Sequence, residues 1–190
     1  MSKRNINMVI GLDLDGVLVD HTDLKIRLAK RLGFNLLPKD TPTEVMNKIL
    51  PEGRWRELQH LLYSDPKLSL LSPLMRGAKS MLNNFQKNKI DYLLISRRKS
   101  TVQALKLLEK RGLWPEYFND KNTFFVVEPE DKNIKAAEFG VTHYIDDERR
   151  VLEKLADVRH RFLFDRHRVF PETDFYKKIH SWPEFYEYLS

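Results

Sequence analysis

The chain has 190 residues, of which 42% are hydrophobic and 32% are charged, and its formal net charge is +6. This length and balance predict one globular domain, or one domain that carries an insertion. The sequence contains no cysteine, which excludes disulfides, thiolate zinc sites and cysteine nucleophiles and suits a cytoplasmic protein.

The first apolar run, residues 8–12, ends at Asp13. It is too short for the apolar region of a secretory signal, and no other stretch approaches the length of a membrane-spanning helix. We therefore expect a soluble cytoplasmic protein with no membrane partner. The positive net charge attracts anions in general. Basic clusters such as Arg97-Arg98-Lys99 most often lie in solvated loops, with a phosphate grip and a nucleic-acid patch as alternatives.

A pair of carboxylates follows this apolar run directly, in the sequence Asp13-Leu14-Asp15-Gly16. Side chains at i and i+2 of a strand point to the same face, so these two anions would lie side by side. Such repulsion needs a cation, a shared proton or water to relieve it. Asp-Gly is also a common turn dipeptide, but a buried strand places the pair at the edge of a sheet where ligands bind.

The next part of the chain is predicted to be helical. Apolar residues recur at helical spacing in three stretches, 22–32, 41–49 and 55–63. Thr41 and Glu44 have the spacing of a capping box, which predicts that the second helix begins there. These helices predict a small helical insertion at 21–75, between the two parts of a core domain at 1–20 and 76–190.

Strands and helices alternate in the second half of the chain. Apolar runs predict strands at 90–95, 123–127, 143–145 and 161–164. Between them, helices are predicted at 77–86, 100–110, 132–139 and 148–156. Ser181 opens a last, aromatic-rich helix, which we expect to pack on the sheet, with a dimer surface as the alternative. The alternation predicts an α/β fold, a Rossmann-like parallel sheet with helices on both faces.

Polar residues stand where several of these elements meet the sheet edge. Ser96 follows one predicted strand, Asp146 and Asp147 follow another, and Lys132 opens a helix. Taken alone, Ser96 fits a strand-end or cap serine, and the aspartates fit the first turn of a helix. Together with Asp13 and Asp15 they form an oxygen-only set that suits Mg²⁺.

These motifs, in this order, resemble those of the haloacid dehalogenase superfamily of Mg²⁺-dependent phosphohydrolases. The match spans roughly residues 8–155. The resemblance implies that Asp13 is the nucleophile, and that Asp15 is the general acid for the leaving alcohol and then the base for water. The second acid distinguishes phosphatases and phosphomutases from dehalogenases and phosphoryl-transfer ATPases, so a phosphatase is expected. The insertion resembles the family's small cap domain.

The same resemblance assigns the remaining roles. Asp13, the main-chain carbonyl of Asp15, and Asp147 would bind Mg²⁺, with Asp146 assisting directly or through water. Ser96 and Lys132 would hold the phosphoryl oxygens, and the neighbouring Arg97 could grip a phosphate as well. Lys135 is the competing candidate for the lysine role, and Lys132 is preferred because it lies nearer the predicted sheet edge.

Within the superfamily, the run from Asp13 to Asp20 resembles the 5′(3′)-deoxyribonucleotidase branch, which favours Val17 and a terminal aspartate. The chain departs from that branch at Ser96-Arg97-Arg98, where nucleotidases carry a second hydroxyl and then proline. An aromatic residue of the insertion could stack on a base; the candidates are Phe34, Trp55 and Tyr63. Trp55 is expected in the core of the insertion instead, and His21 is expected to be a surface loop histidine.

The leading hypothesis is therefore a Mg²⁺-dependent phosphomonoesterase that acts on a small phosphorylated metabolite, with a (deoxy)nucleoside monophosphate as one candidate. The basic clusters suggest an alternative, a phosphatase for nucleic-acid ends, against which the expected cap argues. A non-catalytic binding protein on the same fold is a further alternative, as is a phosphomutase. The sequence predicts no oligomeric state.

Overall fold

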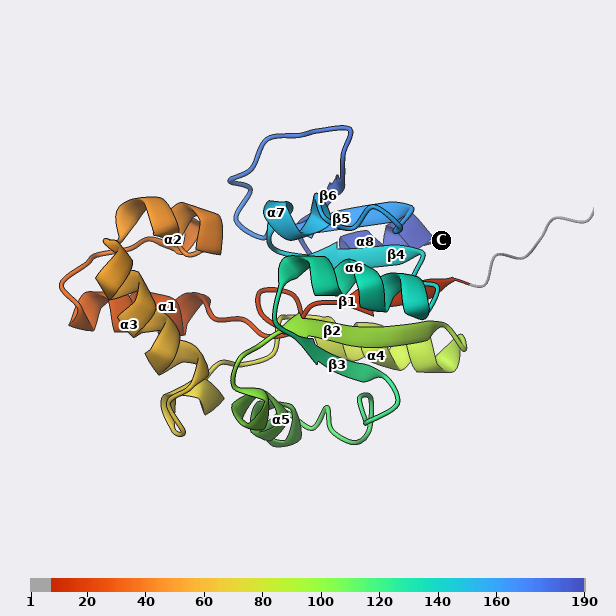
Figure 1. Cartoon of the computed structure of the whole chain (residues 1–190), viewed down its shortest axis with the longest axis horizontal. Coiled ribbons are helices and arrows are strands. Elements are labelled where there is room, and N and C mark those ends of the chain that lie inside the picture. The colour runs from red at the N-terminus through yellow and green to blue at the C-terminus, as the bar shows by residue number, and fades with distance from the viewer. Residues whose placement is uncertain (1–7, 190) are drawn as a thin grey trace, which may run out of the picture.

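The computed structural model describes residues 8–189, and the first seven residues of the predicted core segment 1–20 lie outside that range. Within it lies a six-stranded sheet with strand order β3-β2-β1-β4-β5-β6, in which every neighbouring pair is parallel. The strands are β1 (Val9–Leu12), β2 (Asp91–Arg97), β3 (Thr123–Val126), β4 (His143–Asp146), β5 (His160–Phe164) and β6 (Lys177–Ile179). The predicted parallel α/β sheet is confirmed (Figure 1).

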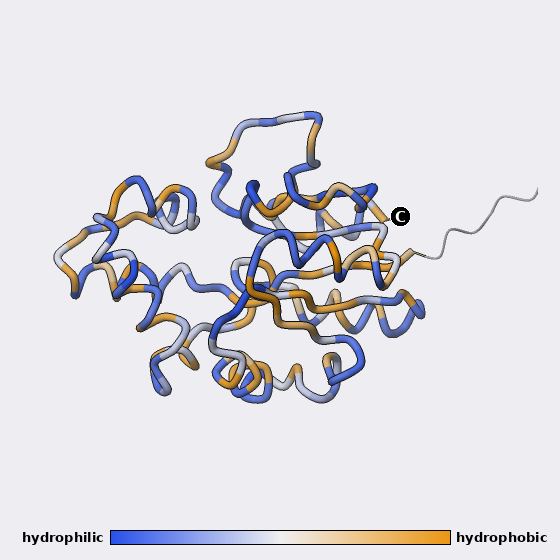
Figure 2. Tube along the Cα trace, in the orientation of Figure 1, coloured by the Kyte–Doolittle hydropathy of each residue, from blue (hydrophilic) through white to orange (hydrophobic). Residues whose placement is uncertain are grey.

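Helices cover both faces of the sheet, as expected. The core on one face includes residues of α4 (Ala78–Lys87), α5 (Thr101–Lys110) and α8 (Trp182–Leu189). The core on the other includes residues of α6 (Pro129–Glu138) and α7 (Arg149–Leu152). Along β2, Leu94 belongs to the first core, and its neighbours Leu93 and Ile95 belong to the second. This alternation follows from the strand period of two, and Figure 2 shows the strands as largely hydrophobic.

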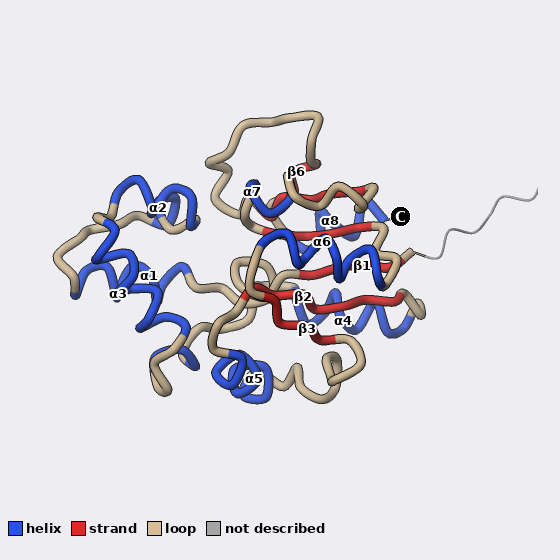
Figure 3. Tube along the Cα trace, viewed as in Figure 1, coloured by secondary structure: helices blue, strands red, loops and turns tan. Residues whose placement is uncertain are grey.

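The chain between β1 and β2 forms helices that extend beyond one end of the sheet (Figures 1 and 3). These are α1 (Thr22–Arg31), η1 (Pro38–Asp40), α2 (Thr43–Ile49), α3 (Glu52–Tyr63) and η2 (Leu68–Leu70). They bury a hydrophobic cluster of their own, which contains Leu28, Trp55 and Leu62. Trp55 therefore belongs to the core of this segment, as the spacing predicted. We call residues 22–70 the insertion; the domain bounds at 20/21 and 75/76 stay a prediction.

The predicted capping box at Thr41 is wrong. Helix α2 begins at Thr43, Pro42 precedes it, and no side chain caps its first turn. The Thr41 hydroxyl instead donates to the carbonyl of Pro38 at 2.7 Å. The Glu44 carboxylate is drawn away from its own helix, because it accepts hydrogen bonds from the main-chain N–H and guanidinium of Arg149 at 2.6–2.9 Å. Glu44 therefore forms a long-range ion pair with Arg149 in place of the predicted local cap.

Three other elements differ from the sequence prediction. Helix α6 begins three residues before Lys132, at Pro129, where the Asp131 carboxylate accepts from the Glu128 N–H at 2.9 Å. Helix α7 ends at Leu152 rather than at residue 156. Strand β6 was not predicted, because a three-residue run with two lysines (Lys177, Lys178 and Ile179) lacks a strand's apolar pattern.

The C-terminal helix packs on the sheet, as predicted. Trp182 and Phe185 of α8 are buried in the first core, and their rings contact Phe164 and Phe162 with centroids 5.5 and 5.0 Å apart. The Trp182 indole donates to the carbonyl of Val17 at 3.2 Å, which ties α8 to the loop after β1. In residues 8–189, none of the helices combines the length and the apolar character needed to cross a membrane.

Candidate active site

The loop after β1 places Asp13 at the carboxyl end of the sheet. The Asp13 N–H donates to the carbonyl of Ile145 on β4 at 3.0 Å, and the Asp15 N–H donates to the Asp13 carboxylate at 2.9 Å. Gly16 then adopts φ +81°. A Cβ at Gly16 would lie 2.1 Å from an oxygen of Asp147. Glycine is therefore required twice, for its backbone conformation and for the close approach of Asp147.

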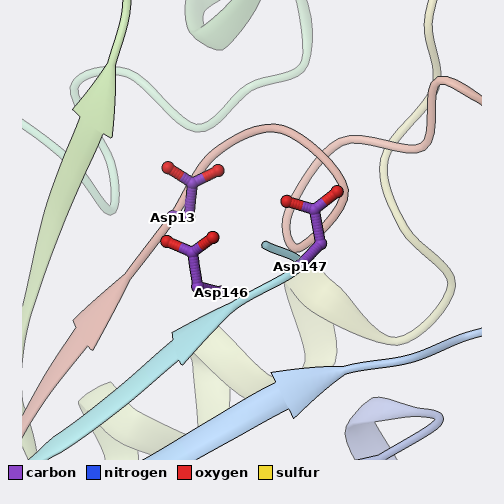
Figure 4. Close-up of side chains that lie close together, drawn as sticks. All are labelled: Asp13, Asp146 and Asp147. Carbon is purple, nitrogen blue, oxygen red and sulfur yellow. The ribbon is translucent and has the colours of Figure 1, made fainter. Parts of the chain in front are cut away.

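Asp13, Asp146 and Asp147 form an acidic cluster at this edge. Each offers a carboxylate oxygen, and these oxygens lie within 4.8 Å of one another. Figure 4 shows the three side chains rising from the ends of β1 and β4 into one space. Asp146 also accepts a hydrogen bond from the Glu148 N–H at 2.9 Å. Part of its role is therefore the one that the sequence offered as an alternative, an aspartate at the start of the next helix.

Lys132 lies between two of these carboxylates. Its ammonium contacts Asp13 at 2.5 Å and Asp146 at 2.7 Å, and its side chain is buried. Lys135, the competing candidate, is one turn away from Lys132 and pairs at 2.7 Å with Glu138, on the surface. The structure thus brings the preferred lysine, Lys132, to Asp13.

The cluster carries more negative charge than Lys132 neutralises. Burial, with a further contribution from Asp146, raises the pKa of Asp13 from 3.8 to about 7. Burial and neighbouring acids, Glu148 first among them, also raise the pKa values of Asp146 and Asp147. Burial alone would lower the pKa of Lys132, but the two carboxylates hold it well above its usual value. The raised acid pKa values reflect burial first and repulsion between the acids second, and a hard cation bound by oxygen ligands would favour the ionised forms against both.

Asp15 makes different contacts from those of Asp13. Its two oxygens accept from the Arg98 guanidinium at 2.7 and 2.5 Å, and one of them contacts the His21 ring at 2.6 Å. Burial raises the pKa of Asp15, but the charge of Arg98 and the hydrogen bond to His21 outweigh it and hold the pKa below its usual range. Neither Arg98 nor His21 was predicted to contact Asp15.

The expectation that His21 lies in a surface loop is wrong. The residue is 3% exposed, and its second ring nitrogen contacts the Ser72 hydroxyl at 2.6 Å. His21 is held in this buried position by its contacts with Asp15 and Ser72. No sequence pattern marks this, since a lone histidine after a loop is usually solvated.

The residues after Ser96 alternate in their environment. Ser96 is 1% exposed, and its hydroxyl has no hydrogen-bond partner within residues 8–189. Arg97 is partly exposed and lies 3.9 Å from Glu148, whereas Arg98 is buried against Asp15. The strand period places residues 96 and 98 on the same side, and this signal could have favoured Arg98 over Arg97.

A pocket of about 550 Å³ lies between this edge and the insertion, and Asp13, Asp15, Lys132 and Asp147 line it. From the insertion it is lined by Thr43, Arg56, Gln59, His60, Tyr63 and Ser64. The Tyr63 ring covers the Arg98 guanidinium, with 4.7 Å between the ring centroid and the central carbon, and meets the His21 ring edge-on at 5.6 Å. We call the pocket-lining residues of the insertion, together with Arg97, Arg98 and Lys99, the opposite wall of the pocket.

Comparisons with known proteins identify the fold. No family model matches the sequence, and no curated protein matches it. Among solved structures, a HAD-superfamily hydrolase from Ehrlichia chaffeensis matches with a TM-score of 0.62 and 12% identity, covering 99% of this chain and 98% of that one. A subfamily IA hydrolase from Geobacter sulfurreducens matches at 0.61 and 17%, covering 100% and 99%.

A third solved structure, a HAD family hydrolase from Deinococcus radiodurans with bound phosphate and sodium, matches with a TM-score of 0.53 and 14% identity, covering 82% of this chain and 79% of that one. At these identities the likeness concerns the fold. The full-length coverage of the first two structures includes the helices between β1 and β2 as well as the sheet. The chain therefore has the α/β fold of HAD-superfamily hydrolases.

Proposed function

We propose that the protein is a Mg²⁺-dependent phosphomonoesterase that hydrolyses a small phosphorylated metabolite through an aspartyl-phosphate intermediate. The observation that carries the proposal is the position of Asp13. Its carboxylate lies at the end of β1, in contact with the Lys132 ammonium and next to Asp146 and Asp147, on the wall of a pocket. A carboxylate held beside a cation can act as a nucleophile toward phosphorus.

In the proposed reaction, an Asp13 oxygen attacks the phosphorus, and the bond from phosphorus to the ester oxygen breaks. Asp15 must first take up a proton, which requires substrate to loosen its contacts with Arg98 and His21. The leaving oxygen then takes this proton from Asp15 and departs as the alcohol. A water molecule then attacks the phosphorus of the aspartyl-phosphate and gives a proton to Asp15. Inorganic phosphate leaves, and Asp13 returns as a carboxylate.

Lys132 orients Asp13 through its 2.5 Å contact and offers positive charge to the transferring group. Ser96 contributes a buried hydroxyl that is free to donate to a phosphoryl oxygen, and Arg97 lines the pocket. In phosphoryl transfer, such positioning and charge stabilisation supply most of the catalysis.

The metal belongs to the proposal because the donor set fits it. Asp13, the main-chain carbonyl of Asp15, and Asp147 would hold Mg²⁺, with Asp146 assisting. The raised pKa values of Asp13, Asp146 and Asp147 support a cation among them. When bound, Mg²⁺ would neutralise negative charge on the phosphoryl oxygens.

A (deoxy)nucleoside monophosphate is one candidate substrate, supported by the Asp13–Asp20 motif and by Tyr63, an aromatic residue that lines the pocket. The alternative, a phosphatase for nucleic-acid ends, draws support from the basic residues Arg97, Arg98 and Lys99 at the pocket. The insertion narrows access from that side, which favours a small substrate over a polymer.

The test is release of inorganic phosphate from a panel of phosphate monoesters with Mg²⁺ or with chelator. The panel holds nucleoside and deoxynucleoside monophosphates, sugar phosphates and a 3′-phosphorylated oligonucleotide. Asp13→Asn should lower turnover by about four orders of magnitude or more, whereas Asp174→Asn, at an exposed carboxylate of the β5–β6 loop, should not change it. Full turnover in Asp13→Asn, or in chelator, would contradict the proposal, and turnover of the oligonucleotide alone would favour the alternative.

A further inference from the structure

Arg98 has one donor group that the protein itself does not use. The side chain is 2% exposed, and its Nε and Nη2 atoms donate to the two oxygens of Asp15. Its remaining terminal nitrogen, Nη1, is buried and has no hydrogen-bond partner among the residues that the structure describes. A buried, charged donor without a partner is costly, which points to an acceptor that binds there.

The surroundings of Arg98 favour an anionic acceptor over a neutral one. Arg98 lines the pocket next to Arg97 and Lys99, and Arg56 and His60 line it from α3. Some of these cations have acidic partners: Arg97 lies 3.9 Å from Glu148, which also pairs with Arg150 at 2.6 Å, and Arg56 pairs with Glu52. Glu128 lines the pocket as well. The donor that keeps no partner belongs to a guanidinium, whose planar fork matches carboxylate and phosphate.

Arg98 also adjoins the point where the ester bond would break. In the proposed function, on which this inference rests, Asp15 serves the leaving oxygen, and Arg98 holds both oxygens of Asp15. An acceptor at Nη1 would thus lie on the leaving-group side of the phosphoryl group and close to the ester oxygen. It would also share the guanidinium charge with Asp15 and loosen the pair that now engages both Asp15 oxygens.

We infer that Arg98 forms a second anion subsite, and that the preferred substrates are compact phosphate monoesters whose leaving group carries a carboxylate or a second phosphate. The transferred phosphoryl group lies at Asp13 and Lys132, and the second anion binds Nη1 of Arg98. Tyr63, whose ring covers the guanidinium, shields this contact from water. Arg98 is therefore the specificity-determining residue of the site.

The test uses three esters that share a two-carbon skeleton: 2-phosphoglycolate, ethane-1,2-diol bisphosphate and 2-hydroxyethyl phosphate. They carry a carboxylate, a second phosphate and a neutral hydroxyl at the same place. With Mg²⁺, we expect kcat/KM for at least one of the two doubly anionic esters to exceed that for 2-hydroxyethyl phosphate by at least about tenfold. The anionic ester with the higher kcat/KM shows whether the second charge is a carboxylate or a phosphate.

The variant is Arg98→Lys, which keeps the charge but lacks the planar fork. We expect the preference to fall to within about threefold, chiefly through a higher KM for the anionic esters, while 2-hydroxyethyl phosphate is still turned over. Circular dichroism and thermal unfolding establish that the variant is folded. Arg54→Lys is the control, because Arg54 pairs with Glu57 at 2.8 Å on the exposed side of α3, and it should leave the preference unchanged.

Calorimetric binding of the same three esters to Asp13→Asn, with and without Arg98→Lys, separates the subsite from the reaction. Preferential binding of an anionic ester that depends on Arg98, without turnover in the wild type, would support the subsite and contradict the phosphatase proposal. Turnover without any preference, or a preference that survives in Arg98→Lys, would overturn the subsite alone. Neither turnover nor preferential binding would overturn both.

Discussion

The two walls of the pocket differ in how their charges are satisfied. At the sheet edge, Lys132 contacts both Asp13 and Asp146. The two aspartates lie at the carboxyl ends of β1 and β4, and Lys132 lies in the first turn of α6. On the opposite wall, Arg98 comes from the segment after β2 and Tyr63 from the insertion, and the guanidinium keeps an unused donor. The first wall is suited to a reaction common to many substrates, and the second to choosing among them.

Lys132→Met should destabilise the protein more than any other substitution at the sheet edge. The substitution leaves the buried carboxylates of Asp13 and Asp146 without their counter-charge, which should destabilise the metal-free fold by roughly 3–5 kcal/mol at neutral pH. Phosphate release should fall at least about a hundredfold. Urea unfolding and initial rates measure the two effects.

Lys135→Met is the matched control for that experiment. Lys135 pairs with Glu138 in an exposed position, and removal of such a pair should cost less than about 1 kcal/mol. Equal effects of the two substitutions would show that the contacts of Lys132 do not distinguish the sheet-edge wall.

The metal-free protein should lose stability as pH rises from about 4 to about 7. Burial raises the pKa of Asp13 from 3.8 to about 7, so the folded state holds this proton more tightly than the unfolded state does. The stability that the proton contributes is fully present below the unfolded pKa and is lost as pH rises through the folded pKa. Urea unfolding in chelator should show this slope in the wild type.

Asp13→Asn should be less sensitive to pH over the same range, because asparagine does not titrate. Saturating Mg²⁺ should flatten the wild-type slope as well, since a bound cation favours the ionised carboxylate. Identical slopes for wild type and Asp13→Asn in chelator would mean that Asp13 is not the buried acid described above.

A smaller effect is expected from the opposite wall. Tyr63→Leu removes the ring that covers Arg98 at 4.7 Å but keeps an apolar side chain. Loss of one cation–π contact is worth about 1 kcal/mol, so KM for an anionic ester should rise about fivefold with little change in kcat. Steady-state kinetics with 2-phosphoglycolate measure it. A fall in kcat at constant KM would instead place Tyr63 among the residues that serve the transfer step.

The smallest effect should come from the contact between the insertion and the core. Glu44→Gln weakens the ion pair with Arg149, in which the side chains are 17% and 29% exposed. Because such partly solvated pairs contribute little, the free energy of unfolding, measured by thermal unfolding, should fall by less than about 1 kcal/mol. Because the insertion would then be less firmly bound to the core, KM should rise by a similar factor for all esters. A change in preference between anionic and neutral esters would show that α2 takes part in selection.

The sequence predicted the sheet-edge wall because its residues stand at strand and helix ends. Parallel strands bring their carboxyl ends together, so Asp13 and Asp147 could be placed next to each other from the strand pattern alone. Strands β1 to β5 agree with prediction within two residues, because each has an apolar run. Lys132 could be preferred to Lys135 because it lies nearer the start of its helix and so nearer the sheet edge, although this helix begins earlier than predicted.

The opposite wall was largely missed, because its contacts depend on how the insertion folds back. Nothing in the local pattern indicates that Tyr63 covers Arg98 or that His21 lies between Asp15 and Ser72. Glu44 shows the same limit: its spacing suggested a local cap, and it pairs with Arg149 from α7 instead. Contacts between segments that are far apart in the sequence leave no periodic signal.

The most direct test of the account is to find the phosphoryl group on Asp13. Wild-type protein is mixed with Mg²⁺ and the ester of the panel that it turns over fastest, quenched in acid within one turnover, digested and analysed by mass spectrometry. We expect one added phosphoryl group on the peptide that contains Asp13 and none in Asp13→Asn. Phosphate release with no modified peptide during turnover, or a phosphoryl group on another residue, would contradict it.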